Sequence, residues 1–345
     1  MFWEGQLIFK IIQFFLFILF LYASNVLAQD DSKNMGHAEY ADKLRNPDYK
    51  YNKLCKNSDE DYDLNLFNFD NNKSLKNSTL PKIFIHYQPE RNERNWEDFG
   101  SRSSYDYNLE LSNICIKSFI KCYSSYCDII IFNNDNVKEL INDESDIICN
   151  IINPSLLKGI DLEQWERYCR AKILYLYGGI VLKPVFYCLN SNNNLLFRDE
   201  FTVANINNNG VNVSNKLFVA NPDYLMSSPA KDRKLLRYCN YLKKLCINNY
   251  SVDKHFSNDE YEFLSTLPTY NEVHLGLIDI NYDQIHMEDL ISNRPLKVHK
   301  SAFCLFIDID NLKKYTKYGW ILKMNKNQIL DSNIAISHIF KQHCL

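Results

Sequence analysis

Glycine is scarce in this chain, and the glycine-dependent nucleotide-binding motifs are missing. Only 9 of the 345 residues are Gly. The sequence contains neither a P-loop nor a G-x-G-x-x-G pattern, in which glycines let the backbone approach phosphates. It also lacks a G-x-S-x-G nucleophile turn and the H-E-x-x-H and H-x₃-H pairs. These absences exclude the common signatures of P-loop enzymes, dinucleotide-dependent enzymes, serine hydrolases and zinc proteases.

An excess of positive charge is also absent. The chain has 39 Lys and Arg against 42 Asp and Glu, a net charge of −3 with the two signs mixed. A nucleic-acid-binding domain needs a basic patch, so we expect no nucleic-acid partner. Hydrophobic residues make up 46 % of the chain, which supports a packed core. The length allows one large α/β domain or two small ones.

The chain has one long apolar run, at residues 7–28. Its central part, residues 11–22, has the length of the apolar region of a signal peptide, and cleavage between Ala28 and Gln29 fits the small residues there. The alternative is an uncleaved anchor, because 22 residues can span a bilayer. In either case residues 30–345 enter the secretory lumen, as a secreted or a single-pass membrane-anchored protein.

Glycosylation sequons and cysteines bear on the same question. Four sequons fit lumenal exposure, at Asn72, Asn77, Asn212 and Asn249. Eleven cysteines follow the apolar run, and in an oxidising lumen we expect some to pair while at least one stays free. Cys122 and Cys127 have no neighbouring His/Cys cluster, which favours buried thiols or disulfides over a zinc site.

Residues 29–79 are polar and rich in Asn, Asp and Lys, which is typical of a stem or linker. We expect residues 80–345 to form a single α/β domain. Its first half shows an alternation of strand and helix patterns: strands at 82–87, 127–132 and 147–151, and helices at 109–123 and 137–142.

This alternation predicts βαβ units and a mostly parallel sheet flanked by helices. Ligands of such sheets bind beyond the carboxyl ends of the strands. We therefore expect His86, Tyr87 and Gln88 at the functional edge, together with residues 133–135.

The second half begins with a helix from Asp161, a suitable N-cap, to Gly178, a suitable C-terminal cap. A strand at 180–188 follows it. The remaining predictions are a hairpin of strands 201–206 and 216–220, helices at 231–246 and 327–340, and a strand within 296–309.

The run Arg170-x₄-Tyr175-x-Tyr177-Gly178-Gly179 resembles the core of the glycosyltransferase family whose sugar-binding region carries a DXD motif, which includes Golgi and fungal mannosyltransferases and capsule-sugar transferases. Leu80-Pro-Lys-Ile-Phe-Ile-His-Tyr is similar to the opening strand of that family. The resemblance implies a GT-A-like fold, a nucleotide-sugar donor, a glycan acceptor and usually Mn²⁺. It further implies hexosyltransferase activity in an active enzyme, with Arg170, Tyr177, Gly178 and Gly179 near the donor.

Lys183 and Val185 stand where this family has its Asp-x-Asp pair. Two Asp at alternate strand positions can hold a divalent cation and, through it, a diphosphate. An ammonium group has no lone pair for a metal, so Mn²⁺ binding is not expected here. In one interpretation Lys183 contacts the diphosphate directly. In the other the fold persists without transfer activity. Pro184 removes a backbone donor, so we expect the strand to fray there.

Two further donor-binding candidates also have structural interpretations. Arg170 is one helical turn from Glu166, so it can simply form an ion pair on its own helix. The family usually has Asp three residues before this Arg, whereas this chain has Arg167. His86 at a strand end can bind a ligand, but it can also be a hydrogen-bonded structural histidine.

Asp308 and Asp310 provide an alternative carboxylate pair. The run Phe306-Ile-Asp-Ile-Asp310 alternates as a strand does, which would place both carboxylates on one face as a metal site. The competing interpretation is a solvated strand end.

The sequence therefore supports two functional hypotheses. The first is a divergent nucleotide-sugar-dependent glycosyltransferase-like protein. The second is a non-catalytic secreted glycoprotein or glycan-binding protein built on a decayed glycosyltransferase fold.

Overall fold

Three parallel strands form the centre of the fold. β1 (Lys82–His86) lies between β2 (Asp128–Phe132) and β3 (Gly179–Leu182). All three are rich in Ile, Val, Leu and Phe and almost wholly buried, as expected for strands covered on both faces. This computed structural model describes residues 75, 78–88, 109–141, 148, 152–157, 159–192, 196–206, 220–248, 258–314 and 317–343, all within the compact unit Ser58–Leu345.

The main sheet has six strands in the order β2-β1-β3-β6-β5-β7. The outer strands are β5 (Thr202–Asn205), β6 (Ala220–Ser228) and β7 (Thr269–Tyr270). β6 pairs antiparallel with both β3 and β5, and every other pairing in this sheet is parallel. The predicted α/β class with a mostly parallel sheet is confirmed.

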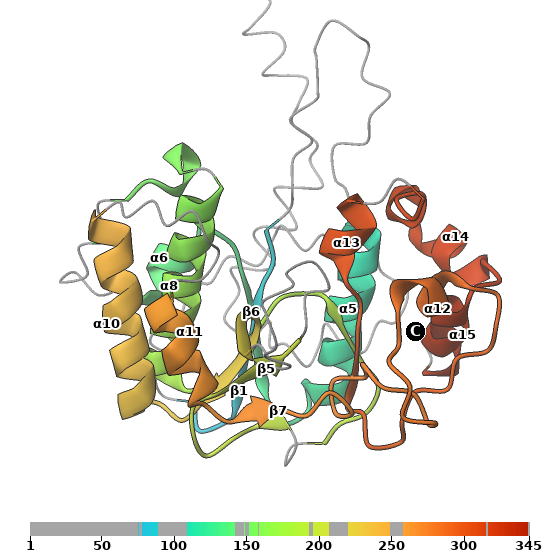
Figure 1. The fold of residues 1–345 in the computed structure, drawn as a ribbon, viewed down its shortest axis with the longest axis horizontal. Coiled ribbons are helices and arrows are strands. Elements are labelled where there is room, and N and C mark those ends of the chain that lie inside the picture. Colours follow the sequence, from blue (N-terminus) through green and yellow to red (C-terminus); the bar gives the residue numbers. More distant parts are fainter. Residues whose placement is uncertain are drawn as a thin grey trace, which may run out of the picture. The chain divides into compact units, whose positions relative to one another are not determined.

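Helices pack on both sides of this sheet (Figure 1). One side holds α6 (Val137–Ile141), α8 (Ile160–Tyr177), α10 (Arg233–Asn248) and α11 (Asn258–Ser265). Their apolar residues form one core with alternate residues of the strands, such as Phe84, Ile130 and Val181. Leu75, which falls in the segment expected to be a linker, is also buried in this core.

The other side holds α5 (Leu109–Tyr123) and a two-stranded antiparallel sheet of β4 (Phe186–Cys188) and β8 (Cys304–Phe306). α5 packs against β4 and against a group of short helices near the C-terminus. The short helices of this part are α12 (Met287–Ile291), α13 (Ile309–Lys314), η4 (Ile321–Lys323), α14 (Lys326–Asp331) and α15 (Ala335–Gln342). The 3-10 helix η3 (Pro154–Leu156) instead precedes α8, and its neighbours Ile152 and Leu157 pack against the core on that side.

Three predicted elements need correction. The strand expected at 180–188 breaks at Lys183–Val185 into β3 and β4, which belong to different sheets. The helix expected at 327–340 is two helices, because Ser332 ends α14 in an extended conformation. Ile148 is helical and its carbonyl accepts from Ile152 N–H at 3.1 Å, so the strand expected at 147–151 is wrong at this residue.

Several predictions concern residues outside the described ones. They include the signal peptide or anchor at 1–28, most of the 29–79 linker, and the sequons at Asn72, Asn77, Asn212 and Asn249. Within the described part of the chain, no helix is both long enough and apolar enough to cross a bilayer.

Candidate functional site

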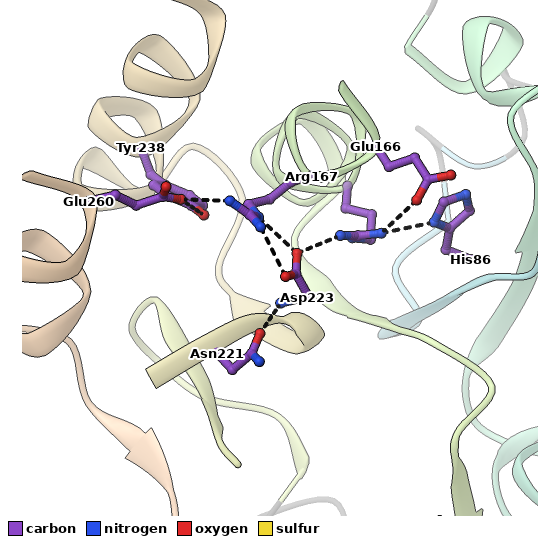
Figure 2. A network of polar contacts seen from close by, with 8 residues as sticks. His86, Glu166, Arg167, Asn221, Asp223, Tyr238 and Glu260 are labelled. Atoms are coloured by element: carbon purple, nitrogen blue, oxygen red, sulfur yellow. Dashed lines mark hydrogen bonds and ion pairs between the residues drawn. The ribbon is translucent and has the colours of Figure 1, made fainter. Parts of the chain in front are cut away.

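The carboxyl ends of the three central strands bring polar side chains together. His86 ends β1, Asn134 follows β2 by two residues, and Lys183 follows β3 directly. β6 runs in the opposite direction, so its first half, including Asp223, lies at this same edge. Arg167 reaches it from α8 (Figure 2). Arg170 reaches it from the same helix through its contacts with His86 and Asp223. The sequence prediction that His86 and residues 133–135 share one edge therefore agrees with the geometry.

His86, Asn134, Glu166 and Arg170 form a closed ring of contacts. Arg170 Nη1 lies 3.1 Å from His86 Nδ1, and His86 Nε2 lies 2.9 Å from Asn134 Oδ1. Asn134 Nδ2 donates to Glu166 Oε1 at 2.7 Å, and Glu166 Oε2 lies 3.7 Å from Arg170 Nη1. Because a guanidinium can only donate, His86 Nδ1 must accept and Nε2 must carry the proton. The ring thus fixes one neutral tautomer of His86.

The environment of His86 opposes its protonation. Burial lowers the pKa of His86 to about 4, and the positive charges of Arg170 and Lys183 act in the same direction. Burial alone would raise the pKa of Glu166, but the positive charges around it and the hydrogen bond from Asn134 lower that pKa overall. At neutral pH the ring therefore holds a neutral imidazole beside an ionised carboxylate.

Asp223 is the centre of a second group of contacts. Arg167 binds it with both Nε (2.8 Å) and Nη2 (2.9 Å), and Arg170 Nη2 donates to the same carboxylate at 3.0 Å. Arg167 Nη1 also contacts Glu260 at 3.1 Å, and Tyr238 Oη donates to Glu260 at 2.8 Å. The two arginine side chains are 0 % and 2 % exposed. Their charge is therefore offset by carboxylates within the protein.

An irregularity in β6 positions Asp223. In β5, the neighbours Val203 and Ala204 pair with Met226 and Asn221, so residues 222–225 have no partner on that strand. The Asn221 side chain accepts a hydrogen bond from Asp223 N–H at 2.9 Å, which holds the bulged segment (Figure 2). A bulge redirects a side chain that regular pairing would leave on the sheet face. Here it accompanies the contact of Asp223 with both arginines.

Lys183 differs from the other charged residues of this edge. Its side chain is only partly buried, and its Nζ lies 5.7 Å from the centre of the Tyr224 ring. Its backbone N–H donates to Tyr224 O at 2.9 Å, which fixes the start of the side chain at the strand end. No ion pair involves Lys183 among the described residues. Its charge acts on His86 and Glu166 without forming an ion pair with a described residue, so it can also attract an anion from outside the protein.

The structure separates Tyr177, Gly178 and Gly179 from this edge. They lie at the amino end of β3, opposite Lys183. Tyr177 Oη donates to Leu140 O at 2.7 Å. Gly178 and Gly179 have φ values of +69° and +98°, and a Cβ at Gly179 would lie 2.2 Å from Lys82 O. Each residue of this motif thus has a structural role in the turn from α8 into β3.

The alternative metal site at Asp308 and Asp310 is wrong in its structural premise. β8 ends at Phe306, and α13 begins at Ile309. The two aspartates therefore do not alternate along one strand. In the part of the chain that the structure describes, no three His, Cys, Asp or Glu side chains are grouped so that they could hold a metal ion.

Sequence reasoning missed Asp223 and Glu260, the carboxylates that bind Arg167. The predicted hairpin ended at residue 220, so Asp223 was not assigned to any strand, and α11, which carries Glu260, was not predicted. The available signal was the pair Arg167 and Arg170 on one helix face, since two buried cations require carboxylates elsewhere in the chain.

The chain matches no protein-family model, and no curated protein is similar enough to count as a relative.

Proposed function

We propose that this chain is a divergent, GT-A-like glycosyltransferase-type protein that binds a nucleotide sugar, with Lys183 as the contact for the donor's diphosphate. The proposal rests mainly on Lys183, a partly exposed cation without an ion pair among the described residues, at the carboxyl end of the central strand β3. That edge is where ligands of parallel α/β sheets bind.

A divalent metal does not fit at this position. Lys183 and Val185 provide no carboxylate, and the carboxylates of this edge, Asp223 and Glu166, are already paired with Arg167 and Arg170. An ammonium group can instead interact with a diphosphate as a point charge. In a transfer reaction Lys183 would stabilise the negative charge that develops on the leaving nucleoside diphosphate. The second substrate would be a glycan acceptor.

Arg170 and His86 have supporting roles in this proposal. Both are buried and bound to other protein groups, so neither is available to contact the donor directly. They hold Glu166 in place, and its side chain is still 13 % exposed. Tyr177, Gly178 and Gly179 are not assigned to the donor site, because they lie at the other end of β3.

The direct test is calorimetric titration of the full-length chain with UDP- and GDP-sugars, with and without Mn²⁺. We expect metal-independent binding that Lys183→Gln weakens at least tenfold. Lys231→Gln is the matched control, because Lys231 also lies over a tyrosine ring, at 4.7 Å, but at the opposite edge. No binding of any donor, or equal weakening by both variants, would contradict the proposal.

The second candidate is a non-catalytic glycoprotein or glycan-binding protein on the same scaffold. The closed ring of His86, Asn134, Glu166 and Arg170 favours it, because in this ring both the imidazole of His86 and the carboxylate of Glu166 are already bound to other protein groups. It predicts glycan binding without nucleotide-sugar binding. Screening the same protein against immobilised glycans and against donors distinguishes the two candidates.

Entry into the secretory pathway belongs to the same proposal, through the apolar run at residues 7–28. Expression in a eukaryotic cell tests it. A lumenal protein would lose mass on treatment with peptide N-glycosidase, whereas a protein that stays outside the lumen would not.

A further inference from the structure

Four cysteines surround the contact between α5 and the small β4–β8 sheet. Cys115 and Cys122 lie on α5, Cys188 ends β4, and Cys304 begins β8. Cys188 and Cys304 are directly opposite each other in the antiparallel pair. The neighbours of Cys188 therefore include one thiol on the helix and one on the adjacent strand.

Cys188 also contacts the helix, on the face that carries Cys122. Ser118 Oγ accepts a hydrogen bond from Cys188 N–H at 2.8 Å, which fixes β4 against this face of α5. Cys122 is four residues after Ser118, on the same face of the helix. The Cys188 thiol donates to Asn190 O at 3.4 Å, and the Cys122 thiol lies near enough to interact with it electrostatically.

We propose that Cys122 and Cys188 are a redox-active dithiol that forms a disulfide by exchange with a small-molecule disulfide. The Cys122 thiolate attacks one sulfur of the oxidant, which gives a mixed disulfide and releases one thiolate. Cys188 then loses its proton and attacks the Cys122 sulfur, which forms the Cys122–Cys188 bond and releases the second thiolate. The protein loses two electrons and two protons, and the oxidant becomes two thiols.

The surroundings of the four thiols assign their roles. Cys122 is the one partly exposed thiol of these four and so is the one that a dissolved oxidant can reach, and the neighbouring Cys188 thiol and the charge of Lys121 lower its pKa against the effect of burial. Burial raises the pKa of Cys188, so it acts second. Burial also raises the pKa of Cys115 and Cys304, and both are buried, which leaves them as unreactive thiols.

The bond would join α5 to β4, five residues after Lys183. Its formation does not depend on the proposed donor site, because neither cysteine contacts a residue of that edge in any described interaction. A covalent link between elements 66 positions apart in the chain also restricts the unfolded state, so the oxidised protein should have a higher Tm than the reduced one.

The test uses the full-length chain treated with oxidised glutathione, followed by alkylation, tryptic digestion without reductant and mass spectrometry. The tryptic peptide 173–198 contains Cys188 as its only cysteine, because Pro184 blocks cleavage after Lys183. We expect it to be joined to peptide 122–138. That peptide also contains Cys127, so Cys127→Ser is the matched control and should leave the link intact, whereas Cys122→Ser should abolish it.

The Cys304→Ser variant should also keep the link. Joining of peptide 173–198 to peptide 301–313, which contains Cys304, would overturn the proposal. So would loss of the link in Cys127→Ser, or glutathione that remains on Cys122 without transfer to Cys188. An unchanged Tm after complete oxidation would contradict the restraint on α5 and β4.

Discussion

The two ends of the central strands, here called the carboxyl edge and the amino edge of the sheet, are held by different kinds of interaction. At the carboxyl edge, two buried arginines of α8 contact three carboxylates from α8, β6 and α11. At the amino edge, Gly178 and Gly179 bring the backbone of β3 close to the backbone of Ala230 and Lys82. The first arrangement depends on charge and therefore on pH. The second depends on the absence of a side chain and has no such dependence.

The comparison also separates fold from function. The motif that suggested a glycosyltransferase is divided between the edges: its glycines build the turn at one, and its arginine contributes to the ion-pair network at the other. The resemblance in this segment is thus explained by structural roles, whereas Lys183, where the chain departs from that family, has no such explanation. Four experiments test this contrast.

The largest effect is expected for Asp223→Ala. The change leaves the bidentate contact of Arg167 and one contact of Arg170 unmade, and two buried cations lose a shared carboxylate. We expect the free energy of unfolding to fall by about 3–5 kcal/mol, measured by urea denaturation. Glu200→Ala is the control, because the Glu200–Lys234 pair is 56 % and 48 % exposed and should contribute less than about 1 kcal/mol. Similar losses of unfolding free energy in both variants would show that the buried ion pairs contribute no more to stability than the exposed pair.

Gly179→Ala should destabilise the amino edge by about 2–4 kcal/mol. The new Cβ would lie 2.2 Å from Lys82 O, so β1 and β3 would have to move apart, and φ is +98°. Gly159→Ala is the matched control, since Gly159 also has a positive φ (+54°) but no atom within 4 Å of the added Cβ. The difference between the two variants measures the steric contact. If they are equally destabilised, the close approach of β3 to β1 is not a constraint.

The carboxyl edge should weaken in acid. The pKa of His86 is about 4 in the folded protein, against 6.5 for an ordinary histidine, so the unfolded chain binds more protons between these pH values. Stability should fall by on the order of 3 kcal/mol as pH decreases from 6.5 to 4. His274, whose pKa is also lowered by burial, contributes with the same sign.

The variant His86→Gln isolates the contribution of His86. Its free energy of unfolding, measured at several pH values, should depend less steeply on pH across this window than that of the unchanged chain. Parallel curves for the two proteins would contradict the assignment of the acid sensitivity to His86.

The smallest effect on stability is expected for Lys183→Gln. Lys183 is partly exposed and has one cation–ring contact at 5.7 Å, so its loss should cost less than about 1 kcal/mol. The comparison of the two edges therefore predicts that Lys183→Gln folds normally and loses only the binding of the donor. A large loss of stability would show that Lys183 belongs to the buried network.

Apart from the strand expected at 147–151, the sequence predicted the described part of the first half of the domain well, for a physical reason. The strands at 82–86 and 128–132 are unbroken apolar runs between polar residues, and the helix at 109–123 has one apolar face. These patterns depend on local burial alone. The break between β3 and β4 was foreseen only as fraying at Pro184, because the choice of a second sheet depends on β8, more than a hundred residues later.

The candidate site was predictable in part. His86 and Asn134 were expected at one edge, since the carboxyl ends of parallel strands converge. Asp223 and Glu260 were not, because a bulge and a short helix carry no periodic signal of sufficient length. The pair of arginines on α8 indicated that such partners exist, but not where they are in the chain.

The sequence by itself determined the α/β class, the parallel centre of the sheet and the glycine turn, because burial periodicity and backbone conformation are local properties. Only the tertiary structure decided which charges are neutralised. In the folded chain Arg167 and Arg170 pair with carboxylates that are 53 to 93 positions away along the sequence. Lys183 has no ion pair among the described residues. Ion pairing depends on distances in space between remote segments, so neither the composition nor the spacing of these residues could have settled it.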